Sequence, residues 1–457
     1  MRLPRVMIGA PSSGSGKTMI TCGILQAFVN RGLKVASFKC GPDYIDPLFH
    51  KEVIGTKSNN LDTFFSNEDT IKYLFGKTAK DADISVMEGV MGFYDGVGGL
   101  STTGSSYELA KMTDTPSILV INCKGMSLSI IPLIQGFLQY RKDSNIIGVI
   151  LNQMSKSLYS ILKEQIEKEI GIKVFGYVPF VKELVILSRH LGLVMPEEID
   201  DFHSKLNELA GILEQTIELD EILQIAGKSC ELYYETPDIP KLNGEIRIGI
   251  AKDEAFCFYY QDNLDLLQDM GAKLIEFSPL HDKELPKDID GILLGGGYPE
   301  LVAEKLSANE SMRESIRTAL NGKMPCLAEC GGFMYLHTQM EDISGKSYPM
   351  VNSIAGEVYK TDKLNRFGYI TLKANQDQMI AVSGESIAAH EFHYFDSNAC
   401  GDSFTAYKPL RTTQWNCIHG NDTMAVGFPH LYYYSNISFP FRFLNTCLDW
   451  KMKNENR

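Results

Sequence analysis

A glycine- and serine-rich loop near the N-terminus has the residue types that bind a nucleotide phosphate. The segment GAPSSGSGKT, which ends at Thr18, lies between a short apolar run and a helical pattern. Gly14 and Gly16 allow backbone N–H groups to turn inward around phosphate, and the helix N-terminus adds its dipole. Lys17 adds a positive charge, and Thr18 offers a hydroxyl to Mg²⁺. The spacing therefore predicts a site for ATP and Mg²⁺, although a proline occupies the position of the strict motif's first glycine.

Polar residues at the ends of other predicted strands could complete this site. Glu88 ends one apolar run, and Asp43 and Asp46 follow another that ends at Lys39. Because open α/β sheets bind ligands at the carboxyl ends of their strands, we predict that Asp46 and Glu88 bind Mg²⁺. Lys39 and Asp43 are predicted to contact the substrate, and the amide of Asn152 to contact the adenine of the cofactor. For the acids and the amide, the alternative is an ordinary helix-capping or turn residue.

A cysteine in the second half has the surroundings of a catalytic nucleophile. Cys330, in the segment AECGG, follows an apolar run and precedes a helical pattern. A sharp strand-to-helix turn exposes such a thiol, and the helix N-terminus favours the thiolate. The N–H groups of Gly331 and of Gly297, which ends an earlier strand, are predicted to form an oxyanion hole. Cys326 lies four residues earlier without a following glycine, and it is predicted to be a core residue.

The nucleophile needs a base, and His430 is the predicted one. A glycine-rich strand end, a cysteine turn and a late histidine follow one another in this order in triad-type glutamine amidotransferases. Those enzymes usually have a glutamate two residues after the histidine, where this chain has Tyr432. The orienting acid is therefore absent, unnecessary or supplied from elsewhere. His390 and His393 remain an alternative as an alternating pair of metal ligands.

The composition is that of a globular protein and excludes several classes of function. The chain has 457 residues, of which 44% are hydrophobic and 22% charged, and its formal net charge is −13. So acidic a balance argues against nucleic acid as a partner. The ten cysteines form no C-x-x-C pair, which excludes zinc ribbons and fits a cytoplasmic location. The longest uncharged stretch, Gly125 to Tyr140, is too short to span a membrane.

Apolar runs separated by helical segments predict two α/β halves. The first is expected at residues 1–230, with a parallel sheet, and the second at residues 246–457. Residues 231–245 contain two prolines and a glycine and are predicted to link the halves. Between Ser347 and Tyr407 the pattern predicts only short strands and turns. The expected strands are Arg5–Ala10, Lys34–Lys39, Ile84–Met87, Ser117–Ile121, Ile146–Leu151, Val174–Val178, Ile246–Ala251 and Lys273–Phe277.

The chain also resembles known families. Its phosphate loop is similar to that of dethiobiotin synthetase, and it has Ser12 where partitioning ATPases have a second lysine. Over essentially its whole length, the chain resembles the cobyrinate a,c-diamide synthase family of corrinoid biosynthesis. The motifs that carry this resemblance are SSGSGKT, KCGPDYIDP, MEGVMG, SRHLGLV, GGGYPE, AECGGFMYL and HEFHY.

The resemblance implies a fold, a set of ligands and catalytic residues. The fold would be α/β, with an N-terminal doubly wound P-loop domain of the dethiobiotin synthetase type and a C-terminal triad-type glutamine amidotransferase domain. The ligands would be ATP, Mg²⁺, glutamine and a tetrapyrrole polycarboxylate. Cys330 would be the nucleophile and His430 its activating base. Arg189, His190 and Arg366 are further candidates to bind the substrate carboxylates.

The chemistry agrees with two linked activities. A carboxylate reacts poorly with ammonia until ATP converts it to an acyl phosphate. One half would supply this activation and the other would release ammonia, with a protected path between them. The same chemistry on nickel-sirohydrochlorin is one alternative, and a regulatory P-loop ATPase with an inactive second half is another. No membrane partner is expected, and a homodimer is left open.

Overall fold

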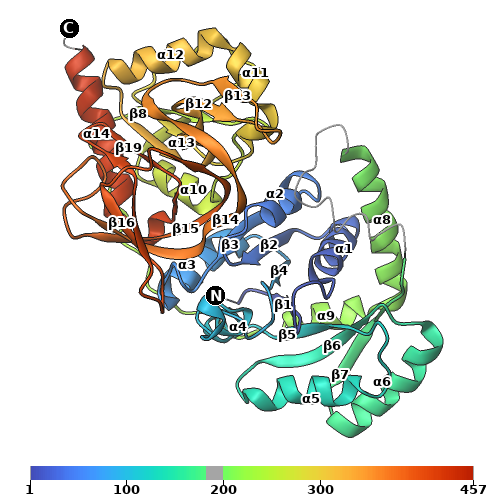
Figure 1. Ribbon diagram of the computed structural model, residues 1–457. Helices are drawn as coiled ribbons and strands as arrows, with labels where there is room; N and C mark the ends of the chain where they lie inside the picture. Colours follow the sequence, from blue (N-terminus) through green and yellow to red (C-terminus); the bar gives the residue numbers. More distant parts are fainter. Residues whose placement is uncertain (1, 182–198, 456–457) are drawn as a thin grey trace. The chain divides into compact units, whose positions relative to one another are not determined.

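The computed structural model describes residues 2–181 and 199–455 (Figure 1). The chain divides into two compact units, Met1–Pro237 and Asp238–Arg457. The segment predicted as a linker is divided between them. Glu231 forms a β-bridge with Arg2 in the first unit, whereas Leu242 donates a hydrogen bond to the Met270 carbonyl in the second.

The first unit is built on a parallel sheet of seven described strands, in the order β3-β2-β4-β1-β5-β6-β7. Most of these strands are apolar and buried, as expected for a sheet that helices cover on both faces. The exception is β3, whose sequence KSNNL gives no apolar signal. The strands are β1 Arg5–Gly9, β2 Val35–Cys40, β3 Lys57–Leu61, β4 Ile84–Glu88, β5 Ser117–Asn122, β6 Ile146–Asn152 and β7 Lys173–Val178.

Helices cover both faces of this sheet. On one face α1 packs against α8, and a side chain at Gly23 of α1 would collide with Leu209 and Leu213 of α8. On the other face Phe75 of α3 contacts Phe38 of β2, with ring centroids 4.9 Å apart. The described helices are α1 Lys17–Asn30, α2 Ile45–Glu52, α3 Glu68–Ala79, α4 Ser106–Met112, α5 Ile130–Tyr140, α6 Lys156–Ile170, α8 Ile199–Thr216 and α9 Leu219–Ala226.

A buried arginine joins the two ends of the first unit. Arg5 in β1 is completely buried, and its guanidinium donates to the carbonyls of Leu3, Thr113, Asp114 and Cys230 at 2.8–3.3 Å. These acceptors offset part of the cost of burying the charge. The first strand is thereby fixed to the last residues of its own unit.

The second unit contains two sheets. The first has the order β18-β19-β11-β10-β8-β9 and is parallel except for β18. Its strands are β8 Ile246–Ala251, β9 Ala272–Phe277, β10 Gly291–Leu294, β11 Cys326–Glu329, β18 His419–Gly420 and β19 Met424–Gly427. The helices of the unit are α10 Gln261–Asp269, α11 Ala303–Ala308, α12 Glu310–Asn321, α13 Gly331–Tyr335 and α14 Ser438–Glu455.

The second sheet corrects one prediction. Ile354–Ala374 forms β14, a strand of 21 residues, and Ser386–Ser397 forms β15, of 12 residues, where only short strands were expected. Register shifts between Lys360 and Gly368, together with charged residues, break the alternation from which a long strand is recognised. The other strands are β12 His337–Glu341, β13 Ser347–Pro349, β16 Phe404–Tyr407, β17 Gln414–Cys417 and β20 His430–Leu431.

The two sheets of the second unit share one hydrophobic core. Val358 of β14 and Phe395 of β15 belong to the same buried cluster as Leu294 of β10 and Ala328 of β11. The N–H of Leu431 in β20 donates to Glu329 Oε1 at the end of β11 at 3.3 Å, so these two strand ends lie side by side. Both units are α/β, so the predicted fold class is confirmed.

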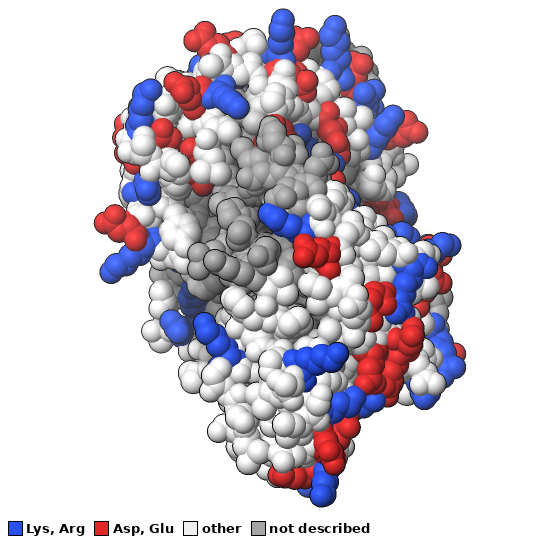
Figure 2. Space-filling model, turned by 90° about the vertical axis from the view of Figure 1, so that its right-hand side faces the viewer, with Lys and Arg blue, Asp and Glu red and all other residues white. Residues whose placement is uncertain are grey.

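Two further features of the described residues are the distribution of charge on the surface and the apolar character of the helices. In the view of Figure 2, acidic and basic side chains are interspersed over the described part of that face. Among the described helices, none combines the length and the apolar character needed to cross a membrane.

Candidate active site

The phosphate loop has the conformation that its glycines permit. Gly14 and Gly16 have φ angles of 75° and 92°, in the left-handed region, and α1 begins at Lys17 directly after them. The Ser15 hydroxyl donates to the Ser12 carbonyl at 2.9 Å, which closes the turn. The first backbone N–H groups of α1 therefore lie at the end of a tight loop, as an anion site requires.

Asn152 braces this loop. The residue ends β6 and is 2% exposed, and its Nδ2 donates to the Ser15 carbonyl at 2.8 Å. Its Oδ1 accepts from the N–H of Gln153 at 2.9 Å. A Cβ at Gly16 would overlap Nδ2. The amide is thus bound to the loop backbone, which favours a role in shaping the phosphate site; contact with adenine stays a prediction.

We expect Gly16→Ala to destabilise the first unit more than Gly14→Ala. Both substitutions force alanine into a left-handed conformation, at a cost of roughly 1–2 kcal/mol. Only Gly16→Ala adds the collision with Asn152, for a further cost of about 1–3 kcal/mol, because no atom lies within 4 Å of a Cβ at Gly14. Calorimetry without nucleotide would measure the unfolding transition of the first unit in each of the two variants. Equal losses in the two variants would contradict the bracing role of Asn152.

Lys17 is held in place by backbone carbonyls. Its Nζ donates to the carbonyl of Met91 at 2.5 Å and to that of Ser12 at 3.5 Å. Burial, reinforced by repulsion from Lys39, lowers the pKa of Lys17 to about 8. Phosphate oxygens at the loop would favour the charged form, since a nearby anion stabilises an ammonium group.

The other residues predicted for the ATP site meet at the carboxyl ends of β2 and β4. Lys39 Nζ donates to Glu88 Oε1 at 2.8 Å and to Asp46, and lies 3.8 Å from Asp43. The Thr18 hydroxyl donates to Glu88 Oε1 at 2.5 Å. Lys39 and Glu88 also pair across the two strands. Parallel register therefore brings together Lys39 and Glu88, which are 49 positions apart in the chain, and Thr18 at the start of α1 reaches the same carboxylate.

Three acids, Asp43, Asp46 and Glu88, surround Lys39 in this cluster. Burial alone would lower the pKa of Lys39, but Asp46, Glu88 and Asp43 raise it well above its usual value. Burial, with the adjacent Glu88, raises the pKa of Asp46. Burial also acts to raise the pKa of Glu88, but Lys39 and His50 outweigh it and lower the value. One ammonium group thus holds a surplus of carboxylates, which leaves capacity for a cation.

The donor set fits Mg²⁺. Thr18 Oγ1 and the carboxylates of Asp46 and Glu88 are the hard oxygen ligands that this ion prefers. Glu88 Oε2 is buried and accepts no hydrogen bond from the described residues. No described group of three or more histidines, cysteines and acids could hold a metal by itself. An ion here would take a hydroxyl, phosphate oxygens and water besides the two acids.

His50 is a member of the cluster that the sequence reasoning missed. It lies in α2 and is completely buried, with Nε2 3.4 Å from Glu88 Oε2. The signal was present in the sequence, because His50 follows Asp46 by four residues and residues at that spacing share a helix face. His50 therefore lies near one oxygen of Glu88 while Lys39 donates to the other.

In the second unit, Cys330 has the backbone of a nucleophile turn. It lies between β11 and α13 with φ 45° and ψ −105°, values that a residue other than glycine adopts only under constraint. Its N–H donates to the Gly427 carbonyl, and the N–H of Gly332 to that of Gly295, which fix the turn on both sides. Burial, and next the charge of Glu300, raise the pKa of Cys330 above its ordinary value. The resting group is thus a buried thiol that needs a base, whereas the sequence pattern predicted an exposed thiol with a favoured thiolate.

The two predicted oxyanion glycines approach each other. Gly297 has φ 155°, and a Cβ there would overlap the Ala255 carbonyl. A Cβ at Gly331 would lie 3.1 Å from the backbone nitrogen of Gly297 and 2.9 Å from Pro299 Cδ. The absence of side chains lets the two backbones approach closely. Their role as oxyanion donors stays a prediction.

His430 lies beside this turn, together with an acid that the sequence reasoning did not single out. Its Nδ1 is 3.7 Å from Oε2 of Glu329, the residue just before Cys330. The imidazole also covers Gly296, where a Cβ would overlap Cε1. Tyr432, at the position where related triads have glutamate, is completely buried and packs against Tyr260 with ring centroids 5.3 Å apart. The structure thus brings the base close to the residues of the predicted thiol site.

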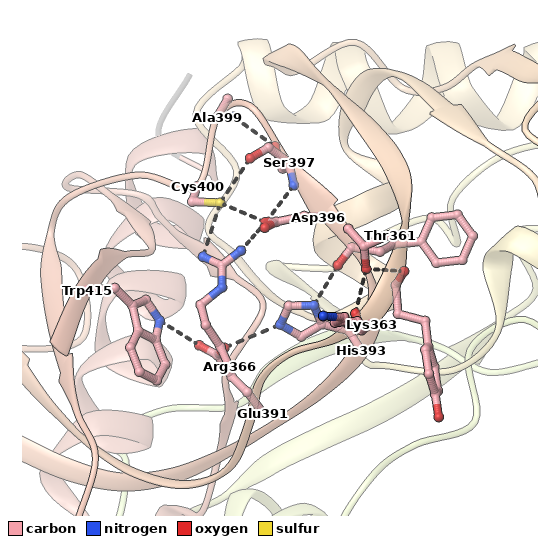
Figure 3. A network of polar contacts seen from close by, with 12 residues as sticks. Thr361, Lys363, Arg366, Glu391, His393, Asp396, Ser397, Ala399, Cys400 and Trp415 are labelled. Carbon is pink, nitrogen blue, oxygen red and sulfur yellow. Dashed lines mark hydrogen bonds and ion pairs between the residues drawn. The ribbon is translucent and has the colours of Figure 1, made fainter. Parts of the chain in front are cut away.

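The HEFHY segment forms a polar network instead of a metal site (Figure 3). His393 contacts Glu391 through Nε2 at 3.3 Å and the Phe395 carbonyl through Nδ1 at 2.6 Å. Trp415 Nε1 donates to the other oxygen of Glu391 at 3.3 Å. His390 is paired in register with His430 of β20. Both ring nitrogens of His393 are engaged, which argues against its use as a metal ligand.

Three cationic residues were predicted to bind the substrate carboxylates, and the structure describes one of them. Arg366 pairs with Asp396 and lies 5.7 Å from the ring of Phe428, within the second unit. Arg189 and His190 lie outside the described residues. The contact of all three residues with the substrate stays a prediction.

Comparison with known proteins assigns a family to each half. Residues 6–193 match the family described as the CobQ/CobB/MinD/ParA nucleotide binding domain. Residues 247–423 match the CobB/CobQ-like glutamine amidotransferase domain. The predicted nucleotide-binding and amidotransferase halves are therefore confirmed.

Relatives extend the match to the whole chain. A cobyrinate a,c-diamide synthase of Caldanaerobacter subterraneus subsp. tengcongensis is 40% identical over 98% of this chain and 99% of its own. Those of Listeria monocytogenes and Picrophilus torridus are 38% and 40% identical, over 95% and 98% of this chain and 97% and 99% of their own. With its two domains and this identity over nearly all of both chains, the protein belongs to the cobyrinate a,c-diamide synthase family of ATP- and glutamine-dependent ligases.

Proposed function

We propose that this enzyme amidates the a and c acetate carboxylates of cobyrinate, using ATP and glutamine, to give cobyrinate a,c-diamide. The observation that carries the proposal is the meeting of Lys17, Thr18, Lys39, Asp46 and Glu88 at one sheet edge of a chain that also has the Cys330 turn. The names of the relatives supply the substrate. We assign activation to the first unit and ammonia release to the second.

In the first unit, a substrate carboxylate oxygen attacks the γ-phosphorus of ATP and ADP leaves. The products are an acyl phosphate and ADP. Lys17 neutralises charge that spreads over the γ-phosphoryl oxygens, and Lys39 orients the attacking carboxylate. Thr18, Asp46 and Glu88 would hold Mg²⁺, which supplies further charge neutralisation when bound.

In the second unit, the Cys330 sulfur attacks the side-chain amide carbon of glutamine while His430 takes the thiol proton. The N–H groups of Gly297 and Gly331 stabilise the oxyanion. His430 then returns the proton to the departing nitrogen, which leaves as ammonia, and water hydrolyses the thioester to glutamate. Ammonia displaces phosphate from the acyl phosphate and forms the amide.

Isotope transfer tests the activated intermediate. With ¹⁸O in the acetate carboxylates, we expect one label per amidation in inorganic phosphate, because the carboxylate oxygen bonded to phosphorus departs with it. ADP should accumulate at two per diamide. Label in AMP, or unlabelled phosphate alongside diamide, would exclude the acyl phosphate route.

The masses of the products separate the two alternative functions from the proposed one. Products weighed after incubation with cobyrinate or nickel-sirohydrochlorin identify the tetrapyrrole. A regulatory ATPase would hydrolyse ATP without forming an amide in either case. We also propose a cytoplasmic location, because all ten cysteines are unpaired, and small molecules as the ligands.

A further inference from the structure

Glu329 lies beside the base of the thiol site. Its side chain is 10% exposed and that of His430 is 2% exposed, so water screens the pair little. Glu329 Oε1 accepts the N–H of Leu431 at 3.3 Å, which fixes the carboxylate, and Oε2 faces Nδ1 of His430 at 3.7 Å. The two residues come from the neighbouring ends of β11 and β20.

We propose that Glu329 is the positioning residue of the glutaminase site, and that it does the work a glutamate two residues after the histidine does in other triads. This inference rests on the proposed function. A carboxylate at Nδ1 orients the imidazole, leaves Nε2 to accept the thiol proton and stabilises the imidazolium that results. Because Glu329 directly precedes Cys330, one strand end fixes both the nucleophile and the orientation of its base.

Other side chains near His430 fit the role less well. Tyr432 carries no carboxylate and packs against Tyr260. Glu391 bonds to His393 and Trp415 through its two oxygens. His390 lies with its ring centroid 6.3 Å from that of His430, and burial, followed by repulsion from His430, lowers the pKa of His390. A neutral imidazole cannot replace the missing negative charge.

Glu329→Gln is the test, because glutamine keeps the acceptor for Leu431 and removes the charge. We expect the glutaminase kcat to fall by about 10²-fold, less than the roughly 10⁴-fold loss for an acid that bonds the imidazole directly. KM for glutamine should stay within about twofold, since the loss lies in the transition state. Labelling of Cys330 by a chloroketone analogue of glutamine should slow in parallel, as read by mass spectrometry. Tyr432→Phe is the matched control and should retain wild-type kcat.

The outcomes separate this inference from the proposed function. Ammonium-driven amidation in Glu329→Gln should equal that of the wild type. An unchanged kcat in Glu329→Gln, or an equal loss in Tyr432→Phe, would overturn the role of Glu329 while leaving the wild-type glutaminase intact. A wild-type protein without glutaminase would instead overturn the proposed function. If Glu329→Gln does not fold, Glu329→Asp, which withdraws the carboxylate from Nδ1, should give a smaller loss of kcat at unchanged KM.

Discussion

Lys17→Ala is expected to abolish amide synthesis with either glutamine or ammonium as the nitrogen source. The loss should be at least about 10³-fold, because phosphoryl transfer depends on positioning and on neutralising charge at the γ-phosphate. The Met91 and Ser12 carbonyls hold the ammonium group at the loop, and alanine removes it entirely. Product formation with each nitrogen source, measured by mass spectrometry, gives the result.

Two controls accompany Lys17→Ala. Basal glutaminase should persist, because Cys330 and His430 belong to the other unit. Lys80→Ala removes an exposed lysine at the end of α3 and should change synthesis by no more than about twofold. Full ammonium-driven turnover in Lys17→Ala would show that the P-loop half is not the synthetase.

Cys330→Ala is expected to eliminate glutamine-dependent amidation and to leave ammonium-driven amidation unchanged. The thiol forms the covalent intermediate, and no neighbouring group can replace a nucleophile that is removed. Added ammonium bypasses this step, because the acyl phosphate forms in the first unit. Initial rates with the two nitrogen sources at saturating ATP would separate the effects.

Cys326→Ala is the matched control for Cys330→Ala. Cys326 is completely buried within β11 and has no strand-to-helix turn to present its thiol, so we expect it to be a core residue. Its substitution should cost stability and leave glutaminase within a small factor. An inactive Cys326→Ala beside an active Cys330→Ala would reverse the two assignments.

Contiguous motifs were predictable because their chemistry lies in one segment of chain. The P-loop and the Cys330 turn each combine a strand, glycines and a helix within about ten residues, so spacing alone indicates their geometry. Parallel strands also made the acids predictable, since Asp46 and Glu88 follow neighbouring strands and their carboxyl ends share an edge. For these parts of the site, the local sequence and the fold class are enough to predict which residues lie together.

Contacts between distant segments could not be predicted in this way. Asn152 meets Ser15 across 137 positions, and Glu329 meets His430 across about 100, so neither pair has a spacing signal. The polar strand β3 gave no apolar pattern, and the register shifts of β14 hid its length. In each case the partner that stabilises the residue is supplied by tertiary structure.

Arg5 has a consequence for the order of events at the ribosome. Translation proceeds from the N-terminus, so β1 is made before the carbonyls of Thr113 and Cys230 that accept from the Arg5 guanidinium. The strands on both sides of β1, β4 and β5, and the helix α8 that packs against α1 are also synthesised later. A nascent chain in which Cys230 has not yet been made therefore lacks part of this shell, and the first unit reaches its final packing only as its last segment leaves the exit tunnel.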